Sequence, residues 1–251
     1  MTEAKQKIQL DEEVSVAMQS LHGNTHENEL GEDALSAVFI GRFQPVHHGH
    51  IKVMKHTLEH VDQLIVVLGS DKSARTTRNP FTSAERALMI YISLKEAGVD
   101  TSRVKMIGVP DLHYHPQLWE AQVQNKVHEI AGKSKVIMTG RPKDATSSYL
   151  QDFPTWQRMY CPPPGEYNAT DARRAMFTGK LDDAAPMLSK GVLELLREWA
   201  NKETFLKLKE EWNAEESFKA SWANAPFPPV FVTTDALIIR SGHILAIRRP
   251  E

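Results

Sequence analysis

The stretch AVFIGRFQPVHHGH, residues 37–50, decides the fold of this chain. Its first four residues form an apolar run that is long enough for one buried strand of a parallel sheet. Gly41 breaks this run, and Pro45 excludes the helical conformation for the residue before it. From Gly49 onward, apolar side chains recur at helical spacing, at Ile51, Met54, Leu58 and Val61. The stretch therefore predicts a strand, a tight loop and a helix.

Two histidines, His47 and His50, flank Gly49 at the start of this predicted helix. Their spacing lets both imidazoles face the same side, and Gly49 has no Cβ to keep a ligand away from the main chain. Backbone N–H groups and the positive end of the helix dipole point to the same place, which suits a phosphate that gains charge during a reaction. The alternatives are a zinc site, which lacks Cys or carboxylate ligands in this loop, and a histidine-rich loop without a ligand.

The pattern H-x-G-H after a first strand resembles the signature of the nucleotidyltransferase superfamily. The longer phrase GRFQPVHHGH is similar to that of nicotinamide-mononucleotide (NMN) adenylyltransferases of the archaeal type. This resemblance implies that AMP passes from ATP to NMN by direct in-line attack, which gives NAD and pyrophosphate. It implies catalytic roles for His47 and His50, and Mg²⁺ that is held mainly by the ATP phosphates. It also implies ATP or phosphate contacts from Gly41, Arg42, Phe43 and Gly49.

Composition and charge narrow the class of protein. Of the 251 residues, 41% are hydrophobic and 25% charged, which is ordinary for a soluble globular protein. There is no apolar run of membrane-spanning length and no signal-peptide pattern at the N-terminus. Cys161 is the single cysteine, so an internal disulfide is excluded and a reducing, cytoplasmic location is expected. The net charge of −2 speaks against general nucleic-acid binding, and the sequence leaves homo-oligomer formation open.

The charge is unevenly distributed along the chain. Residues 1–34 hold eight acidic and two basic side chains, which leaves a balance of +4 on residues 35–251. We expect the first segment to be a mobile acidic extension with a short helix at Val14–Leu21. The positive remainder suits a small anionic ligand. We divide it into a nucleotidyltransferase domain at 35–200, a helical cap or linker at 201–224, and a Pro-rich linker with the first strands of a further domain at 225–251.

Strands and helices alternate through the predicted nucleotidyltransferase domain. Further strands are expected at Gln63–Leu68, Val104–Val109, Lys135–Thr139 and Arg158–Cys161. Helices are expected between them, from a capping box at residues 82–85 to about Glu96, at Gln117–Ile130 and at Thr170–Phe177. This order predicts an α/β fold with a Rossmann-like parallel sheet, whose ligands lie beyond the carboxyl ends of the strands.

The C-terminal segment predicts a hairpin of Phe231–Ile239 and Ile244–Arg248 around Ser241-Gly242. Residues 228–251 resemble the start of a Nudix hydrolase domain, which in bacteria is fused behind an adenylyltransferase of this kind. The Nudix signature, a Gly followed by R-E-x-x-E-E, does not occur in this chain. We therefore expect an incomplete Nudix-like domain and no support for pyrophosphohydrolase activity.

Two basic motifs lie farther along the chain. The segment NATDAR, residues 168–173, resembles the superfamily motif S-x-T-x-x-R at the start of a helix, with Asn168 in place of the usual Ser. Thr170 is expected to cap the helix and bind a phosphate, and Arg173 to reach the same anion with a catalytic role. The segment TTRNPFT is similar to the family's R-[DN]-P-F-T, which implies phosphate binding by Arg78. Without a ligand, the first motif would be a helix N-cap with a solvated Arg, and Arg78 of the second would be a solvated surface charge.

Two further segments are assigned by resemblance. Asp111 and Trp119 match positions beside the nicotinamide ring, where an indole stacks and a carboxylate accepts from a carboxamide. Without a ligand, Asp111 would be a turn residue and Trp119 a core residue. The segment GRPKDATSSYLQDFP resembles the bifunctional bacterial branch, in which Gly140 would let adenine approach the main chain and Lys143 would meet the phosphates.

Two other functions remain as alternatives. One is a different H-x-G-H nucleotidyltransferase, which acts on nicotinic acid mononucleotide, phosphopantetheine or a cytidylyl substrate. The other is a regulator that binds NAD without turning it over. Neither a helix-turn-helix stretch nor a P-loop kinase motif supports the regulator.

Overall fold

The computed structural model of this protein describes residues 14–17, 19, 21, 30–140, 153–161, 165, 167–227, 230, 238–240 and 242–245. Residues 14–17, 19 and 21 have helical backbone, in agreement with the short helix expected at Val14–Leu21. Residues 1–13, 18, 20 and 22–29 of the acidic extension lie outside the described residues, as do Lys143 and most of the strands expected after residue 230.

A five-stranded sheet forms the centre of the protein, and every neighbouring pair of its strands is parallel. The strands run in the spatial order β3-β2-β1-β4-β5 and comprise β1 Leu35–Gly41, β2 Gln63–Leu68, β3 Val104–Gly108, β4 Lys135–Thr139 and β5 Gln157–Met159. This confirms the predicted α/β fold, although the last strand begins and ends earlier than expected. The order of the strands reverses beside β1, and the carboxyl ends at such a switch point are where open α/β sheets bind ligands.

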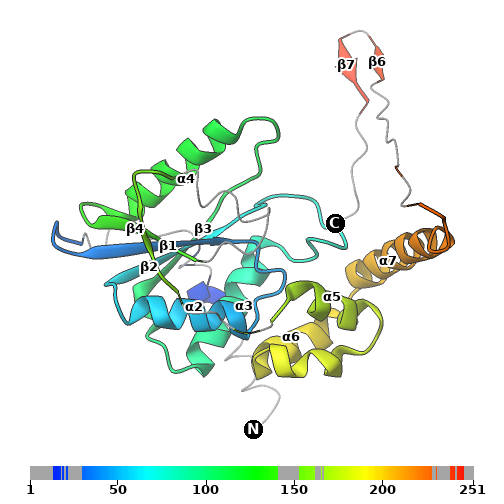
Figure 1. Cartoon of the computed structure of the whole chain (residues 1–251), viewed down its shortest axis with the longest axis horizontal. Helices are drawn as coiled ribbons and strands as arrows, with labels where there is room; N and C mark the ends of the chain where they lie inside the picture. The colour runs from blue at the N-terminus through cyan, green and yellow to red at the C-terminus, as the bar shows by residue number, and fades with distance from the viewer. Residues whose placement is uncertain are drawn as a thin grey trace.

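Alternate side chains of the strands enter two separate hydrophobic cores. Phe39 and Val66 point to one face of the sheet, which is covered by helices α2 (His48–Leu58) and α3 (Ser83–Glu96). Val38 and Ile65 point to the other, which is covered by α4 (Pro116–Ala131). Figure 1 shows α4 on the side of the sheet opposite α2 and α3. Because the strands are apolar on both faces, they read as continuous hydrophobic runs in the sequence.

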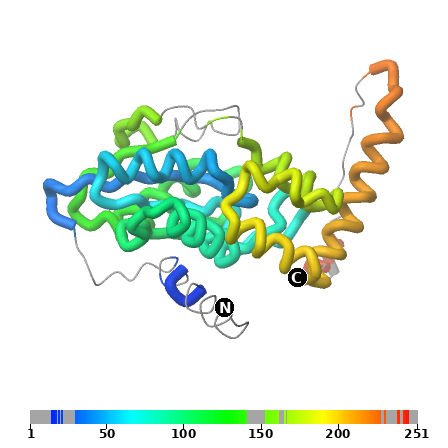
Figure 2. The backbone as a smooth tube through the Cα atoms, turned by 90° about the horizontal axis from the view of Figure 1, so that it is seen from below, coloured from blue at the N-terminus to red at the C-terminus, as the bar shows by residue number. Residues whose placement is uncertain are grey.

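The C-terminal helices extend the first of these cores. They are α5 Ala169–Phe177, the 3₁₀ helix η3 Leu181–Met187, α6 Lys190–Trp199 and α7 Glu203–Ser221. The ring of Phe177 stacks on Phe205 at 5.7 Å and on Trp212 at 5.0 Å, while Trp199 contacts Phe81 at 4.9 Å between ring centroids. The first half of α7 therefore packs into the same core, whereas its second half extends away from the sheet (Figures 1 and 2).

Beyond α7 the described residues contain a short hairpin. Strand β6 (Ile239–Arg240) pairs antiparallel with β7 (His243–Ile244), at the position where the sequence predicts a turn. None of the helices in the described ranges is both long enough and apolar enough to cross a membrane.

Candidate active site

A cavity of about 310 Å³ opens at the carboxyl ends of β1 and β2. Four segments that are distant in the sequence supply its walls: the loop after β1, the end of β2, the region from β3 into α4, and the start of α5. The lining residues are Ile40, Gly41, Arg42, Phe43, Gln44, His50, Gly69, Ser70, Asp111, Trp119, Ala169 and Arg173. The cavity thus lies at the switch point of the sheet, where the sequence places the site.

The loop after β1 folds tightly around the ring of Phe43. A Cβ on Gly41 would lie 2.7 Å from Cζ of Phe43, so this close packing requires glycine. Phe43 itself has a left-handed backbone conformation, with φ of 51°. The side chain of the buried Gln44 fixes the other side of the loop, since it donates to the carbonyl of Phe81 at 2.8 Å and accepts from the N–H of Phe81 at 2.9 Å.

The two histidines of the H-x-G-H pattern stack on each other, with ring centroids 3.7 Å apart. His50 lines the cavity, whereas His47 is buried, with 4% of its surface exposed, and is not one of the lining residues. The backbone N–H of His47 donates to Nδ1 of His50 at 3.3 Å. Because Nδ1 accepts this bond, the proton of the neutral ring lies on Nε2, so His50 can act as a hydrogen-bond donor.

Gly49 is buried, and the protein's own side chains fill the space beside it. A Cβ at this position would lie 3.0 Å from Cε1 of His47 and 3.3 Å from Cβ of Tyr167. The glycine therefore allows the ring of His47 to fold back against the helix. Approach of a ligand to the main chain at Gly49 stays a prediction.

Arg173 holds the start of α5 against the loop after β1. Its Nη1 donates to the carbonyl of Gln44 at 2.6 Å, and its Nη2 donates to Oγ1 of Thr170 at 3.2 Å. Burial, followed by the positive charges of Arg42 and Arg78, lowers the pKa of Arg173 to about 10. Arg42 and Arg78, which come from two other segments, are therefore each close enough to Arg173 to act on its charge.

The N-cap of α5 is Asn168, whose Oδ1 accepts from the N–H of Thr170 at 2.9 Å. The prediction that Thr170 caps this helix is therefore wrong, because the helix begins one residue earlier than expected. Thr170 lies in the first turn, where its hydroxyl is held by Arg173. A contact of Thr170 or Asn168 with phosphate stays a prediction.

Arg78 lies in a turn that is fastened to a distant helix. Backbone hydrogen bonds join Thr76 and Asn79 in both directions, at 3.3 and 3.1 Å, so Thr77 and Arg78 form the tip of the turn. The hydroxyl of Thr77 donates to the carboxylate of Glu215 on α7, 3.2 Å from each oxygen.

The other basic side chains of this region have different surroundings. Arg75 makes a bidentate ion pair with Glu85, at 2.6 and 3.0 Å, which fixes the loop in front of α3. Lys72 lines a neighbouring cavity of about 260 Å³.

Arg86 is a site residue that the sequence interpretation missed. It is fully buried and donates at 2.7 Å to the carbonyl oxygens of both Arg42 and Gly69, which joins the ends of β1 and β2 beneath the cavity. Burial lowers the pKa of Arg86 to about 10, while the negative charges of Asp71 and Asp111 act in the opposite direction. The burial of Arg86 could have been inferred from its spacing, because Arg86, Ile90 and Leu94 recur every four residues and share one buried face of α3.

Asp111 and Trp119 both line the cavity, as expected for a shared ligand. Oδ1 of Asp111 accepts from the N–H of Ser70 at 3.2 Å, and half-buried Trp119 meets Phe153 edge to face at 6.1 Å. Gly140 directly follows β4 and is not one of the residues that line this cavity. Lys143 lies outside the described residues.

A family model described as cytidylyltransferase-like matches residues 38–175, which is more than half of the chain. The chain belongs to the cytidylyltransferase-like family. The segment that it shares with this family begins in β1 and ends in α5, so it contains both the histidine loop and Arg173.

Two relatives that match this chain are aligned over most of their own lengths. The nicotinamide/nicotinic acid mononucleotide adenylyltransferase of Acinetobacter baylyi is 32% identical over 182 residues, which cover 72% of this chain and 94% of the relative. The nicotinamide-nucleotide adenylyltransferase of Ignicoccus hospitalis is 34% identical over 168 residues, which cover 65% and 92%. The cytidylyltransferase-like chain therefore resembles enzymes that are named for adenylyl transfer to a mononucleotide.

A solved structure from Francisella tularensis has the same fold, with a TM-score of 0.73 and 29% identity. It is described as a bifunctional NMN adenylyltransferase/ADP ribose pyrophosphatase in complex with AMP and a manganese ion. The match covers 84% of this chain and 62% of that one, so this chain spans about three fifths of the bifunctional protein's length. The Nudix-like character of residues 225–251 stays a prediction.

Proposed function

We propose that this protein transfers the adenylyl group of ATP to NMN, which gives NAD and pyrophosphate. The observation that carries this proposal is that Arg42, Arg173 and His50 line one cavity, where the charges of Arg42 and Arg78 both act on Arg173. Like charges in a half-buried place are costly unless an anion with several negative charges neutralises them, and the triphosphate of ATP is such an anion. The names of the relatives support the adenylyl group and the mononucleotide.

The reaction needs no nucleophile from the protein, because the phosphate of NMN is already anionic and can attack the α-phosphorus of ATP directly. Catalysis then consists of alignment and charge stabilisation. Nε2–H of His50 would donate to the reacting phosphates, with His47 stacked behind it to fix the ring. The three arginines would hold the phosphate chain, and Gly41, Phe43, Gly49, Gly140, Lys143, Asn168 and Thr170 remain proposed contacts of ATP.

A divalent ion fits this site mainly through the substrate. Among the described residues that line the cavity, Asp111 supplies the one carboxylate, and it already accepts a backbone hydrogen bond. Mg²⁺ commonly keeps its waters and binds phosphate oxygens with few protein ligands, which agrees with this sparse set. When bound, it would supply charge neutralisation to the phosphates.

We assign the nicotinamide end of NMN to Asp111 and Trp119. The indole offers a flat face and the carboxylate an acceptor, and both line the cavity that His50 and Arg173 also line. We also keep the division at residues 35–200, 201–224 and 225–251 as a proposal. A cytoplasmic location is likewise a proposal, which rests on the single cysteine.

The deciding experiment is incubation of the protein with ATP, Mg²⁺ and one acceptor at a time: NMN, nicotinic acid mononucleotide or phosphopantetheine. We expect release of pyrophosphate and formation of NAD, identified by mass spectrometry. Nicotinic acid mononucleotide is included because the name of the Acinetobacter relative covers both mononucleotides. Binding of NAD with no release of pyrophosphate in the presence of any acceptor would instead favour a regulator that binds NAD without turning it over.

The variant Trp119→Ala tests whether this side chain contacts NMN and not ATP. We expect it to raise the KM for NMN at least fivefold and to change the KM for ATP much less, because stacking on a base-like ring contributes about 1 kcal/mol or more. If neither KM changes, the nicotinamide assignment is wrong while adenylyl transfer itself is unaffected.

A further inference from the structure

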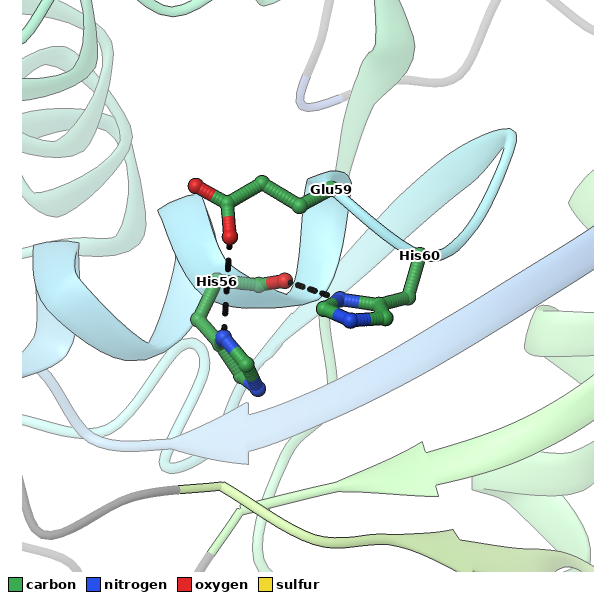
Figure 3. Close-up of side chains that lie close together, drawn as sticks. All are labelled: His56, Glu59 and His60. Atoms are coloured by element: carbon green, nitrogen blue, oxygen red, sulfur yellow. Dashed lines mark hydrogen bonds and ion pairs between the residues drawn. The ribbon is translucent and has the colours of Figure 1, made fainter.

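A second group of histidines lies at the C-terminal end of α2, away from the cavity. His56 lies in the last turn of α2, and Glu59 and His60 directly follow the end of the helix. One potential ligand atom from each of the three lies within 4.8 Å of the other two. Figure 3 shows the Glu59 carboxylate and the His60 ring turned toward His56. His56 is half-buried, and the other two side chains are exposed.

The hydrogen bond of His60 prepares its ring to act as a ligand. Nδ1 of His60 lies 2.9 Å from the carbonyl oxygen of His56. A carbonyl oxygen can only accept, so Nδ1 carries the proton and Nε2 of the neutral ring has a free lone pair. Histidines that bind metals usually hold their second nitrogen in this way, by donation to a carbonyl or a carboxylate.

The spacing of His56 and Glu59 also fits a metal ion. Nδ1 of His56 and Oε2 of Glu59 are 3.6 Å apart, which is too far for a good hydrogen bond. Two ligands that each lie about 2.1 Å from a tetrahedral ion are separated by about 3.4 Å. An ion between these two atoms would therefore need little movement of either side chain.

We propose that His56, Glu59 and His60 bind a divalent ion of the zinc class, with water as the fourth ligand. Two imidazoles and one carboxylate suit Zn²⁺, Co²⁺ or Ni²⁺ and not Mg²⁺, which prefers oxygen ligands. The site is separate from the catalytic cavity, because α2 spans 11 residues and is therefore about 16 Å long. The inference does not depend on the reaction proposed above.

The charges near this site act in both directions. The C-terminal end of a helix carries partial negative charge, which favours a cation. The guanidinium of Arg103 already uses some of this charge, since it donates to the carbonyl oxygens of Leu58, Val61 and Asp62. Arg103 binds backbone carbonyls, so it leaves the three proposed ligand side chains available, but its charge will weaken the affinity for a metal ion.

The test is calorimetric titration of the metal-stripped full chain with ZnCl₂ in buffer that contains excess Mg²⁺. We expect wild type to bind one equivalent of Zn²⁺ more than the double variant His56→Ala/His60→Ala. Glu59→Gln should lower the affinity for that Zn²⁺ ion about tenfold or more, since loss even of an outer partner of a metal site commonly lowers affinity that much. Co²⁺ at the same site should give the visible absorption of a four-coordinate ion in wild type alone.

The matched control is His128→Ala, which removes an exposed histidine from α4. It should retain the wild-type stoichiometry and affinity, and circular dichroism with thermal unfolding should report that every variant is folded. Equal stoichiometry and equal affinity in wild type and the double variant would overturn the proposal. A Co²⁺ spectrum typical of six-coordinate ions would overturn the proposed geometry.

Discussion

The two ends of helix α2 each carry a pair of histidines, yet their surroundings prepare them for ligands of opposite charge. At the N-terminal end, the stacked rings of His47 and His50 lie beside the cavity that Arg42 and Arg173 line. At the C-terminal end, the rings of His56 and His60 are 4.7 Å apart and lie next to Glu59. The residue type is the same, so the difference must come from the helix and its neighbours.

The backbone at each end selects the form of the imidazole. A backbone N–H at the start of the helix donates to Nδ1 of His50 and leaves Nε2–H as a donor for an anion. A backbone carbonyl at the end of the helix accepts from Nδ1 of His60 and leaves Nε2 as a lone pair for a cation. The backbone N–H groups at the start of a helix and the carbonyls at its end thus also determine what a nearby histidine can bind.

The largest effect is expected at the phosphate end. His50→Ala should lower kcat about a hundredfold or more, which is the usual cost of removing one donor to a developing charge. His56→Ala, at the other end of the same helix, is the control and should keep kcat within about twofold. Initial rates of pyrophosphate release measure both. Near-wild-type turnover in His50→Ala would remove the proposed difference between the two ends.

The opposite end should contribute stability and not catalysis. Arg103→Met removes the donors to three carbonyl groups at the end of α2, so the free energy of unfolding should fall by about 1–3 kcal/mol with kcat unchanged. Urea denaturation measures this as a lower midpoint at a constant slope. Arg197→Met, which breaks an exposed ion pair with Asp182, should cost about 1 kcal/mol or less. An equal loss in both variants would argue against a special role for Arg103.

The positive charge of Arg173 should destabilise the folded protein until an anion binds. Because the pKa of Arg173 falls to about 10 on folding, the unfolded chain binds more protons than the folded chain above about pH 10. The cost of this charge is therefore fully present at neutral pH and is relieved as the pH rises above about 10.

Arg173→Gln tests this cost at neutral pH. The variant should bind pyrophosphate about tenfold more weakly. Its melting temperature without ligand should change little, because relief of the buried charge offsets the lost hydrogen bonds to Gln44 and Thr170. Thermal unfolding with and without pyrophosphate measures both quantities. An unchanged pyrophosphate shift would exclude Arg173 from the anion site.

The smallest effect is expected from Glu215 of α7, which supports the turn that contains Arg78. Glu215→Ala removes the acceptor that holds Thr77, and Arg78 lies beside it in the same turn. We expect the KM for ATP to rise about three- to fivefold with little change in kcat, since one hydrogen bond contributes about 1 kcal/mol. Glu210→Ala, an exposed glutamate of the same helix, is the control. If both variants behave alike, α7 does not position Arg78.

The alternation of apolar strands and amphipathic helices was sufficient to predict the parallel sheet, because each element must bury its own apolar face. The motif around His50 predicted a site at the carboxyl ends of the strands, where the structure has a cavity, since loops after parallel strands meet at one edge. Asp111 and Trp119, which only their resemblance to a family indicated, line the same cavity as His50, and their contact with the nicotinamide ring stays a prediction.

Errors arose where a residue's role depends on a partner that is distant in the sequence. The cap of α5 is Asn168 and not Thr170, because a helix boundary depends on where the chain enters from the sheet. His47 was expected to share the site with His50 but is buried behind it. Arg86 was missed because its acceptors, the carbonyl oxygens of Arg42 and Gly69, meet only after β1 and β2 pair.

The sequence by itself determined the order of the elements, the sheet and the tight loop between β1 and α2, because these follow from local periodicity and from the geometry of glycine, proline and helix ends. Only the tertiary structure decided which arginines repel one another, which histidine faces the cavity, and that a second histidine pair stands beside a carboxylate at the far end of α2. Charges act through space, over distances that the order of residues along the chain does not reveal.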